Sequence, residues 1–203
     1  SMQKATCGFF RPSPLRRGFG SLVTPALADA LQASLGLIAP NEVQQSAVCA
    51  AKEGHSVLTV AQTGSGKTLC FLLPILERLI EAPNADALVL APSRELVVQH
   101  AKVADQICAA LPAAPDVCAV DDAWSASSSM SGRGRLLVAQ PEDAIAALQA
   151  QRWDIARLSC VALDEADAIL CAGPYDSTLS PTGETLLAAL EATEAGRALY
   201  LTT

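Results

Sequence analysis

Apolar residues follow two alternating patterns along this 203-residue chain. Short apolar runs rich in β-branched residues are typical of buried strands, and longer segments with apolar residues every three or four positions are typical of amphipathic helices. The predicted strands cover residues 56–60, 86–91, 117–120, 136–139, 159–163 and 198–201. The predicted helices cover residues 25–35, 41–53, 69–80, 93–110, 141–149 and 183–192. Strands alternating with helices predict an α/β fold, a mostly parallel sheet with helices on both faces.

Three stretches fall outside this alternation. Residues 1–18 carry basic side chains among prolines and glycines, and we expect a flexible arm whose first two residues are left from an expression tag. A phosphate-contacting tail is the alternative for this arm. The serine-rich stretch 125–134 predicts a mobile loop, and residues 171–182, rich in Gly, Pro and Ser, predict a lengthened loop.

The segment 61–68 reads A-Q-T-G-S-G-K-T and lies between a predicted strand and a predicted helix, as a phosphate-binding loop requires. Its glycines let backbone N–H groups turn toward a phosphate, and the helix presents its positive end to the same anion. Lys67 would reach the β- and γ-phosphates, and Thr68 would ligate Mg²⁺. The alternative, a glycine-rich turn with a chance lysine, does not explain the flanking pattern. The predicted nucleotide-binding residues here are Thr63, Gly64, Ser65, Gly66, Lys67 and Thr68.

An acidic cluster, Asp164-Glu165-Ala166-Asp167, follows the apolar run 159–163. Carboxylates at the end of a buried strand are costly unless a positive charge meets them. A Mg²⁺ ion held between Asp164 and the nucleotide phosphates would supply that charge, and Glu165 could then orient or deprotonate the attacking water. The alternative is an acidic helix N-terminus stabilised by the helix dipole.

Charge and composition set broad limits. A net charge of −7 is not typical of a nucleic-acid-binding domain, and no apolar run approaches the ~20 residues that span a bilayer. Seven cysteines without a C-x-x-C pair favour a reducing, intracellular compartment, without distinguishing cytoplasm, nucleus or organelle. His55 and His100 are far apart and away from paired cysteines, so we interpret them as structural or surface groups rather than zinc ligands.

These motifs, in this order, resemble the first RecA-like domain of the DEAD-box ATP-dependent RNA helicases, over residues 19–203. The resemblance implies a RecA-like P-loop NTPase fold, ATP and Mg²⁺ as cofactors, and RNA bound through its backbone. Residues 40–44, P-N-E-V-Q, look like the family's Q motif, in which Gln44 would read the adenine edge and Phe19 would stack on the base. The amide of Gln44 can both donate and accept, which suits adenine. Asn41 and Gln44 also form a capping-box pattern at a helix start.

Residues 92–96, P-S-R-E-L, look like the family's P-T-R-E-L segment, which contacts the RNA backbone. By this resemblance Pro92, Ser93 and Arg94 are RNA-binding residues, and Ser93 is also a candidate N-cap. The family pairs this domain with a second RecA-like domain, which this chain lacks. We therefore expect the chain to be monomeric and to hydrolyse ATP poorly by itself.

Three segments depart from the family pattern. Asp121 and Asp122 stand where a glycine pair is usual, and residues 140–143, Q-P-E-D, stand where T-P-G-R is usual. Leu201-Thr202-Thr203 replaces S-A-T, the segment that couples hydrolysis to RNA unwinding; Asp167 would be its partner, with Thr202 or Thr203 in place of the serine. Carboxylates repel phosphate, so we predict that ATP binding is kept while RNA binding is weakened.

Three functions follow from these observations. The first is an ATPase, with Lys67, Asp164 and Glu165 as catalytic residues, that drives RNA duplex separation or RNA–protein remodelling. The second is a degenerate helicase that acts as an ATP-gated clamp or protein scaffold. The third, a P-loop ATPase acting on DNA or protein, fits less well with the adenine-reading segment.

Overall fold

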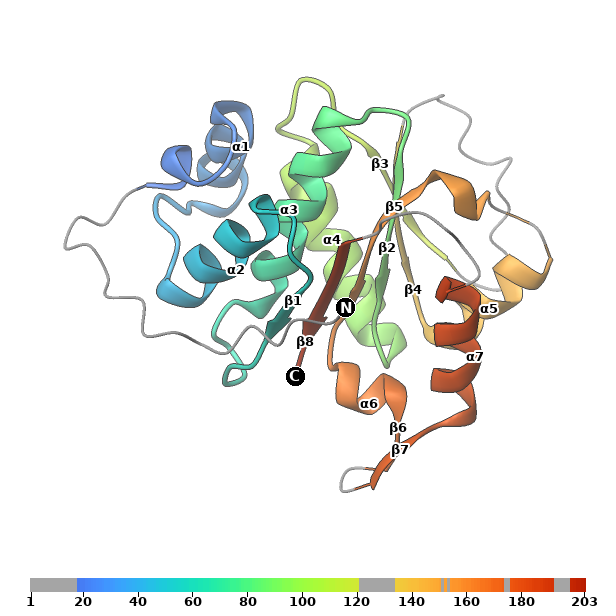
Figure 1. Cartoon of the computed structure of the whole chain (residues 1–203). Helices are drawn as coiled ribbons and strands as arrows, with labels where there is room; N and C mark the ends of the chain where they lie inside the picture. The colour runs from blue at the N-terminus through green and yellow to red at the C-terminus, as the bar shows by residue number, and fades with distance from the viewer. Residues whose placement is uncertain (1–17, 121–133, 151, 153, 174–175, 192–197) are drawn as a thin grey trace.

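The computed structural model describes residues 18–120, 134–150, 152, 154–173, 176–191 and 198–203. Within these residues, six strands form one sheet in the order β1-β8-β5-β2-β4-β3, and every neighbouring pair is parallel (Figure 1). The strands are β1 Val57–Thr59, β2 Asp86–Leu90, β3 Asp116–Ala119, β4 Arg135–Ala139, β5 Leu158–Leu163 and β8 Ala198–Thr202. The predicted α/β fold with a parallel sheet is confirmed.

Helices cover both faces of the sheet, as predicted. Buried side chains of α1 to α4 share one hydrophobic cluster with the sheet, and those of α5 to α7 share another. Two short 3₁₀ helices, Phe19–Ser21 and Ile155–Arg157, complete the connections. The helices are α1 Pro25–Leu35, α2 Glu42–Lys52, α3 Lys67–Glu81, α4 Arg94–Cys108, α5 Pro141–Gln149, α6 Ala166–Leu170 and α7 Pro181–Glu191.

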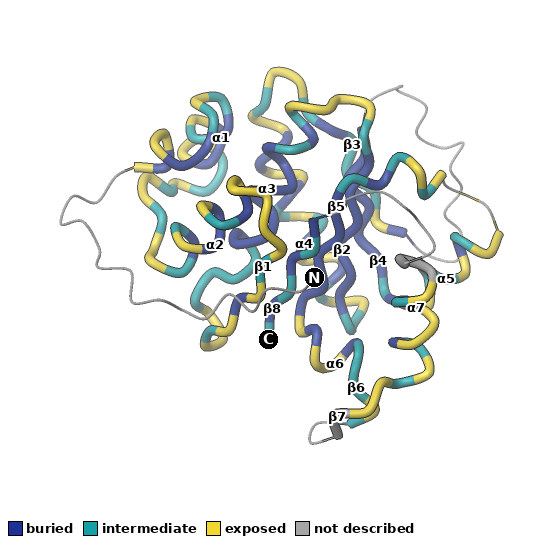
Figure 2. The backbone as a smooth tube through the Cα atoms, in the orientation of Figure 1, coloured by how far each residue is buried: buried dark blue, intermediate teal, exposed yellow. Residues whose placement is uncertain are grey.

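The central strands are buried on both sides. In β2, Val89 belongs to the cluster under α1 to α4, and its neighbour Leu88 belongs to the cluster under α5 to α7. All five residues of β2 and of β4 are buried, which is why both strands read as continuous apolar runs after their first residues, Asp86 and Arg135 (Figure 2). Such an interior places loops, rather than strand faces, where a ligand can reach them.

Helix starts follow the predicted caps. The Asn41 side chain accepts from the Gln44 N–H at 2.9 Å, and the Gln44 side chain accepts from the Asn41 N–H at 3.0 Å, which completes a capping box. Ser93 Oγ accepts from the Leu96 N–H at 3.3 Å at the start of α4. Both predicted N-caps are confirmed.

The lengthened loop predicted for residues 171–182 is wrong. Strands β6 (Cys171–Gly173) and β7 (Asp176–Leu179) pair antiparallel in a second, two-stranded sheet, and α7 begins at Pro181. Composition misled here because Ser180 is an N-cap, accepting from the Gly183 N–H at 2.9 Å, and proline is well suited to the first helical position. The predictions for residues 1–17, for Asp121 and Asp122, and for 125–133 lie outside the described residues.

A buried ion pair fixes the amino-terminal edge of the sheet. Arg135 Nη2 lies 2.6 Å from Asp86 Oδ2, and Arg157 Nη2 lies 3.4 Å from Asp86 Oδ1. The hydrogen bond to Asp86 raises the pKa of Arg135, although burial opposes this.

Among the described residues, no helix is long and apolar enough to cross a membrane.

Candidate nucleotide-binding site

Three neighbouring strands bring the predicted nucleotide segments together. The loop 61–68 follows β1, Asp164 and Glu165 follow β5, and Thr202 ends β8. Because β8 lies between β1 and β5 and all three are parallel, their carboxyl ends meet at one edge of the sheet. This edge is the candidate site.

Glycines shape the loop that follows β1. Gly64 and Gly66 both have φ near +79°, a region that residues with a Cβ avoid. At Gly66 a Cβ would also lie 2.5 Å from Gln44 Nε2, whereas at Gly64 it would meet nothing within 4 Å. Gly66 is therefore required both by its backbone conformation and by the close approach of Gln44.

The segment before α2 is tied to this loop by two side chains. Asn41 Nδ2 donates to the Ser65 carbonyl at 2.7 Å, and Gln44 Nε2 donates to the Gly66 carbonyl at 3.2 Å. Gln44 is buried, so these bonds fix its amide beside the loop. The structure thus brings together two segments that lie about twenty residues apart in the sequence.

Lys67 connects the loop to the end of the chain. Its Nζ donates to the Ala61 and Thr203 carbonyls, both at 2.8 Å. The Thr203 N–H in turn donates to the Thr59 carbonyl at 3.2 Å, which extends the pairing of β1 with β8. Lys67 therefore lies in the first turn of α3 with its ammonium group directed along the site edge.

The donor set fits a magnesium-bound nucleotide. Ser65 Oγ is buried in the loop without a hydrogen-bond partner among the described residues, as expected of a hydroxyl that a ligand oxygen would complete. No group of three or more His, Cys, Asp or Glu side chains that could hold a metal occurs in the described part of the chain. Mg²⁺ needs no such group, because it is usually bound through one or two carboxylates, phosphates and water.

Asp164 is held by two partners from different elements. Its Oδ2 lies 2.7 Å from His100 Nε2 on α4, and its Oδ1 accepts a hydrogen bond from Thr202 Oγ1 on β8. Burial alone would raise the pKa of Asp164, but the hydrogen bonds from His100 and Thr202 outweigh it and hold that pKa below its usual value. Asp164 is therefore ionised at neutral pH, which is the state that its predicted role as a magnesium ligand requires.

Thr202 also holds Glu165, the residue that follows Asp164. Its Oγ1 accepts from the Glu165 N–H at 3.2 Å. Glu165 has φ 51° and is the single non-glycine residue with positive φ in the described part of the chain. Strained backbone of this kind costs about 1–3 kcal/mol and is concentrated at functional sites.

The coupling segment makes a different contact from the one expected. Thr202 does contact the acidic motif, but through Asp164 and the Glu165 N–H rather than through Asp167. The Asp167 side chain is exposed and has no partner among the described residues. The cause is the position of β8 beside β5, which sets the last side chain of β8 against the first residue after β5.

His100 is the site residue that sequence reasoning missed. It is 1 % exposed and contacts the predicted magnesium carboxylate, whereas His55 is exposed beside Glu53. One signal was present in the sequence: His100 has the helical spacing of Val97, Ala104 and Ile107, which form the buried face of this amphipathic helix.

Phe19 lies in the core rather than at the ligand face. It is 2 % exposed and packs in the cluster shared by α1 to α4. Its ring therefore offers no free face for a base in this conformation, and the stacking role stays a prediction.

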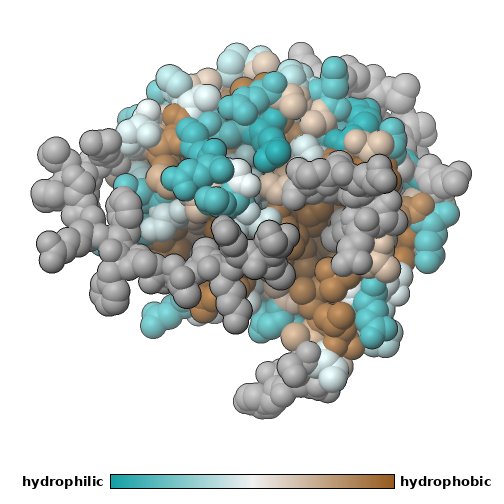
Figure 3. All heavy atoms as spheres, in the orientation of Figure 1, coloured by the Kyte–Doolittle hydropathy of each residue, from teal (hydrophilic) through white to brown (hydrophobic). Residues whose placement is uncertain are grey.

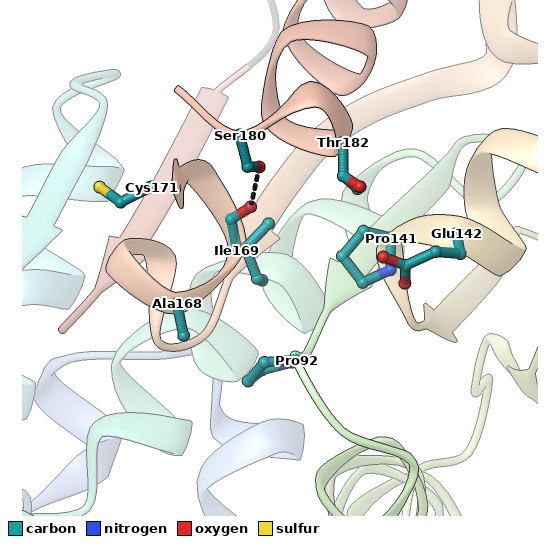
Figure 4. Close-up of a pocket in the computed structure, with 8 residues that line it drawn as sticks. All are labelled: Pro92, Pro141, Glu142, Ala168, Ile169, Cys171, Ser180 and Thr182. Carbon is teal, nitrogen blue, oxygen red and sulfur yellow. Dashed lines mark hydrogen bonds between the residues drawn. The ribbon is translucent and has the colours of Figure 1, made fainter. Parts of the chain in front are cut away.

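The predicted RNA-binding residues lie at the neighbouring strand ends. Pro92 lines a pocket together with Pro141 and Glu142, the first residues of α5, and with Ile169 and Ser180 (Figure 4). Ser93 is partly used as a helix cap, and Arg94 is exposed at the start of α4. The structure thus places one acidic departure, Glu142, beside the segment predicted to contact RNA.

Hydrophobic side chains gather above the β6–β7 hairpin in the surface view (Figure 3).

Fold and site together define a P-loop NTPase domain of the RecA-like class. The profile of the DEAD/DEAH box helicase family matches residues 41–195, and the chain belongs to this family as its N-terminal RecA-like domain.

Individual relatives agree. The chain is 35 % identical over 166 residues to the ATP-dependent RNA helicase DBP8 of Mycosarcoma maydis, covering 77 % of this chain and 31 % of that protein. It is 35 % identical over 154 residues to the probable ATP-dependent RNA helicase DDX47 of Mus musculus, covering 73 % of this chain and 33 % of that protein. The ADP-bound RNA helicase Prp28 of Chaetomium thermophilum has a similar structure, with a TM-score of 0.73, 26 % identity, and coverage of 95 % of this chain and 46 % of that one. The chain thus spans about a third of the length of these curated relatives.

Proposed function

We propose that this chain binds ATP with Mg²⁺ and is the ATPase domain of an RNA helicase that unwinds RNA or remodels RNA–protein complexes. The observation that carries this proposal is the pair of hydrogen bonds from Asn41 and Gln44 to the carbonyls of Ser65 and Gly66. These bonds hold the Gln44 amide, predicted to recognise adenine, beside the predicted phosphate-binding loop. This arrangement supports an adenine nucleotide as the ligand rather than an arbitrary phosphate.

The spare hydrogen-bonding capacity of Gln44 supports adenine. Its Oε1 accepts from the Asn41 N–H, and its Nε2 donates to the Gly66 carbonyl. A carboxamide has two lone pairs on oxygen and two hydrogens on nitrogen, so one acceptor site and one donor remain. These match the N6 donor and the N7 acceptor of adenine.

The other side chains divide the work on the phosphates. Lys67, with its third ammonium hydrogen unused by Ala61 and Thr203, would bind the β- and γ-phosphates as the loop opens. Thr68 and Asp164 would hold Mg²⁺, directly or through water, and Mg²⁺ supplies charge neutralisation at the phosphates. Glu165 would orient the attacking water and accept its proton.

The coupling to RNA needs more than this chain. The relatives named above are RNA helicases of which the match with this chain covers about a third, and by resemblance a second RecA-like domain supplies an arginine that stabilises the transition state. We expect the chain alone to bind nucleotide but to turn ATP over slowly.

An ATP-gated clamp or scaffold is the second candidate function, and one observation favours it. Glu142 lies in the same pocket as Pro92, at the segment predicted to contact RNA. A carboxylate there opposes phosphate binding, although it also favours the N-terminus of α5. Retained ATP binding with weak RNA binding would support the clamp.

The first experiment measures binding of fluorescent ADP and GDP analogues to the chain in the presence of Mg²⁺. We expect ADP to bind more tightly than GDP, Lys67→Met to lose at least about tenfold in affinity, and Gln44→Ala to lose the preference for adenine. Lys102→Met, which removes an exposed lysine on α4, is the matched control. Absence of nucleotide binding by the wild-type chain would refute the proposal.

A further inference from the structure

His100 is a buried polar residue whose side chain contacts Asp164 and Phe71. Its side chain is 1 % exposed on α4, and its Nε2 lies 2.7 Å from Asp164 Oδ2. The carboxylate is an acceptor, so Nε2 carries the hydrogen. The ring also meets Phe71 edge to face, with centroids 5.5 Å apart and planes at 89°. The imidazole is thus held in one orientation between an aromatic ring and a carboxylate.

Packing alone does not explain a histidine here. Its Nδ1 is buried without a hydrogen-bond partner among the described residues, and an unpartnered buried nitrogen costs free energy. The surrounding side chains of α3 and α4 are apolar, including Phe71, Val97 and Ala104. A leucine would fill such a site without that cost, so what the histidine adds is the bond to Asp164.

That bond completes the fixation of the carboxylate. Thr202 donates to Oδ1 from β8, and His100 donates to Oδ2 from α4, so each oxygen has a donor on a different element. The backbone N–H of Asp164 donates to the Leu90 carbonyl at 2.9 Å and fixes the main chain as well. With one donor removed, the carboxylate is free to rotate and keeps a poorly satisfied oxygen.

We propose that His100 is a positioning residue that orients the Asp164 carboxylate for Mg²⁺, an inference that rests on the proposed magnesium–nucleotide function. It acts through Asp164 and does not touch the ligand itself. Groups that hydrogen-bond a metal ligand commonly contribute about 10–100-fold to metal affinity. The consequence is specific: His100 should matter for magnesium and not for the nucleotide without magnesium.

The test compares ADP binding at increasing free Mg²⁺ and in excess EDTA, using the 203-residue chain and a fluorescent ADP analogue. For His100→Leu we expect unchanged binding in EDTA and about a tenfold higher Mg²⁺ concentration at the midpoint. His100→Gln, whose amide nitrogen reaches the place of Nε2, should return the midpoint to within about threefold of wild type. His100→Asn, whose amide nitrogen reaches only the place of Nδ1, should not. Gln99→Leu, an exposed neighbour on α4, is the control.

The outcomes separate the two proposals. If the wild-type chain binds no ADP under any condition, the proposed function fails. If it binds ADP with a magnesium response that His100→Leu leaves unchanged, the positioning role is refuted and His100 is structural only. If His100→Leu does not fold, the pair His100→Gln and His100→Asn decides, and equal magnesium midpoints in those two variants would overturn the inference.

Discussion

The two halves of the carboxyl edge of the sheet are built differently. At β1, β8 and β5, side chains cross from one segment to another: Gln44 to Gly66, Lys67 to Thr203, and Thr202 to Asp164. At β2 and β4, a helix cap at Ser93 and a backbone bond from the Ala91 N–H to the Ala139 carbonyl shape the strand ends, and Glu142 lines the pocket beside them. The first half is cross-linked around the predicted nucleotide loop, and the second carries a carboxylate beside the segment predicted to contact RNA.

The glycine at position 66 gives the largest expected effect and tests the cross-linked half. Gly66→Ala should cost at least about 2 kcal/mol of unfolding free energy and most nucleotide affinity, because it adds backbone strain and a Cβ 2.5 Å from Gln44 Nε2. Gly64→Ala adds strain in open space and should cost only about 1 kcal/mol. Denaturant unfolding measures both, with Gly20→Ala as control, since a Cβ there meets nothing within 4 Å. Equal losses at 64 and 66 would show that contact with Gln44 is unimportant.

The hydroxyl of Thr202 gives the next effect. Thr202→Val keeps the shape but leaves Asp164 Oδ1 and the Glu165 N–H without their partner, so we expect a loss of about 1–3 kcal/mol in unfolding free energy. Thr203→Val should change stability little, because the described bonds of Thr203 are made by its backbone. If both valine variants unfolded at the same denaturant concentration, the Thr202 hydroxyl would not contribute to stability as expected.

Replacing the strained residue Glu165 should raise the unfolding free energy, whereas the two changes above lower it. Asparagine tolerates positive φ better than glutamate, so Glu165→Asn should raise unfolding free energy by about 0.5–1 kcal/mol. In a protein that includes the second domain, the same variant should lose RNA-stimulated ATP turnover. Thermal unfolding and phosphate release measure the two effects. A lower unfolding free energy for Glu165→Asn would contradict the interpretation that the backbone strain at Glu165 is kept for function.

The smallest effect is expected on the half with Glu142. Glu142→Gln should raise affinity for single-stranded RNA about two- to fivefold at low salt, and less at high salt, because it removes a carboxylate beside Pro92. Glu81→Gln, which removes an exposed carboxylate at the last residue of α3, is the control with the same net charge. Fluorescence anisotropy of labelled RNA measures the difference. Identical affinities for the two variants would show that Glu142 does not face the RNA.

Much of the fold was predictable because apolar periodicity and helix caps are local. Helices 25–35 and 141–149 agree with α1 and α5 in both bounds, and the capping box at Asn41 is present. The β6–β7 hairpin was missed because its strands are only three and four residues long, C-A-G and D-S-T-L, and neither forms an apolar run or a clear apolar alternation. Local pattern therefore predicts elements where burial is strong and fails where it is weak.

By itself, the sequence determined the strand, glycine loop and helix around residues 61–68, which predict phosphate binding, and the acidic pair after β5, since each is a contiguous pattern. The tertiary structure decided three relations that join distant positions: Gln44 against Gly66, Thr202 with Asp164 rather than Asp167, and His100 against Asp164. The physical reason is that strand order sets which loops become neighbours. The order β1-β8-β5-β2 places a strand near the end of the chain and a helix from its middle on either side of one carboxylate.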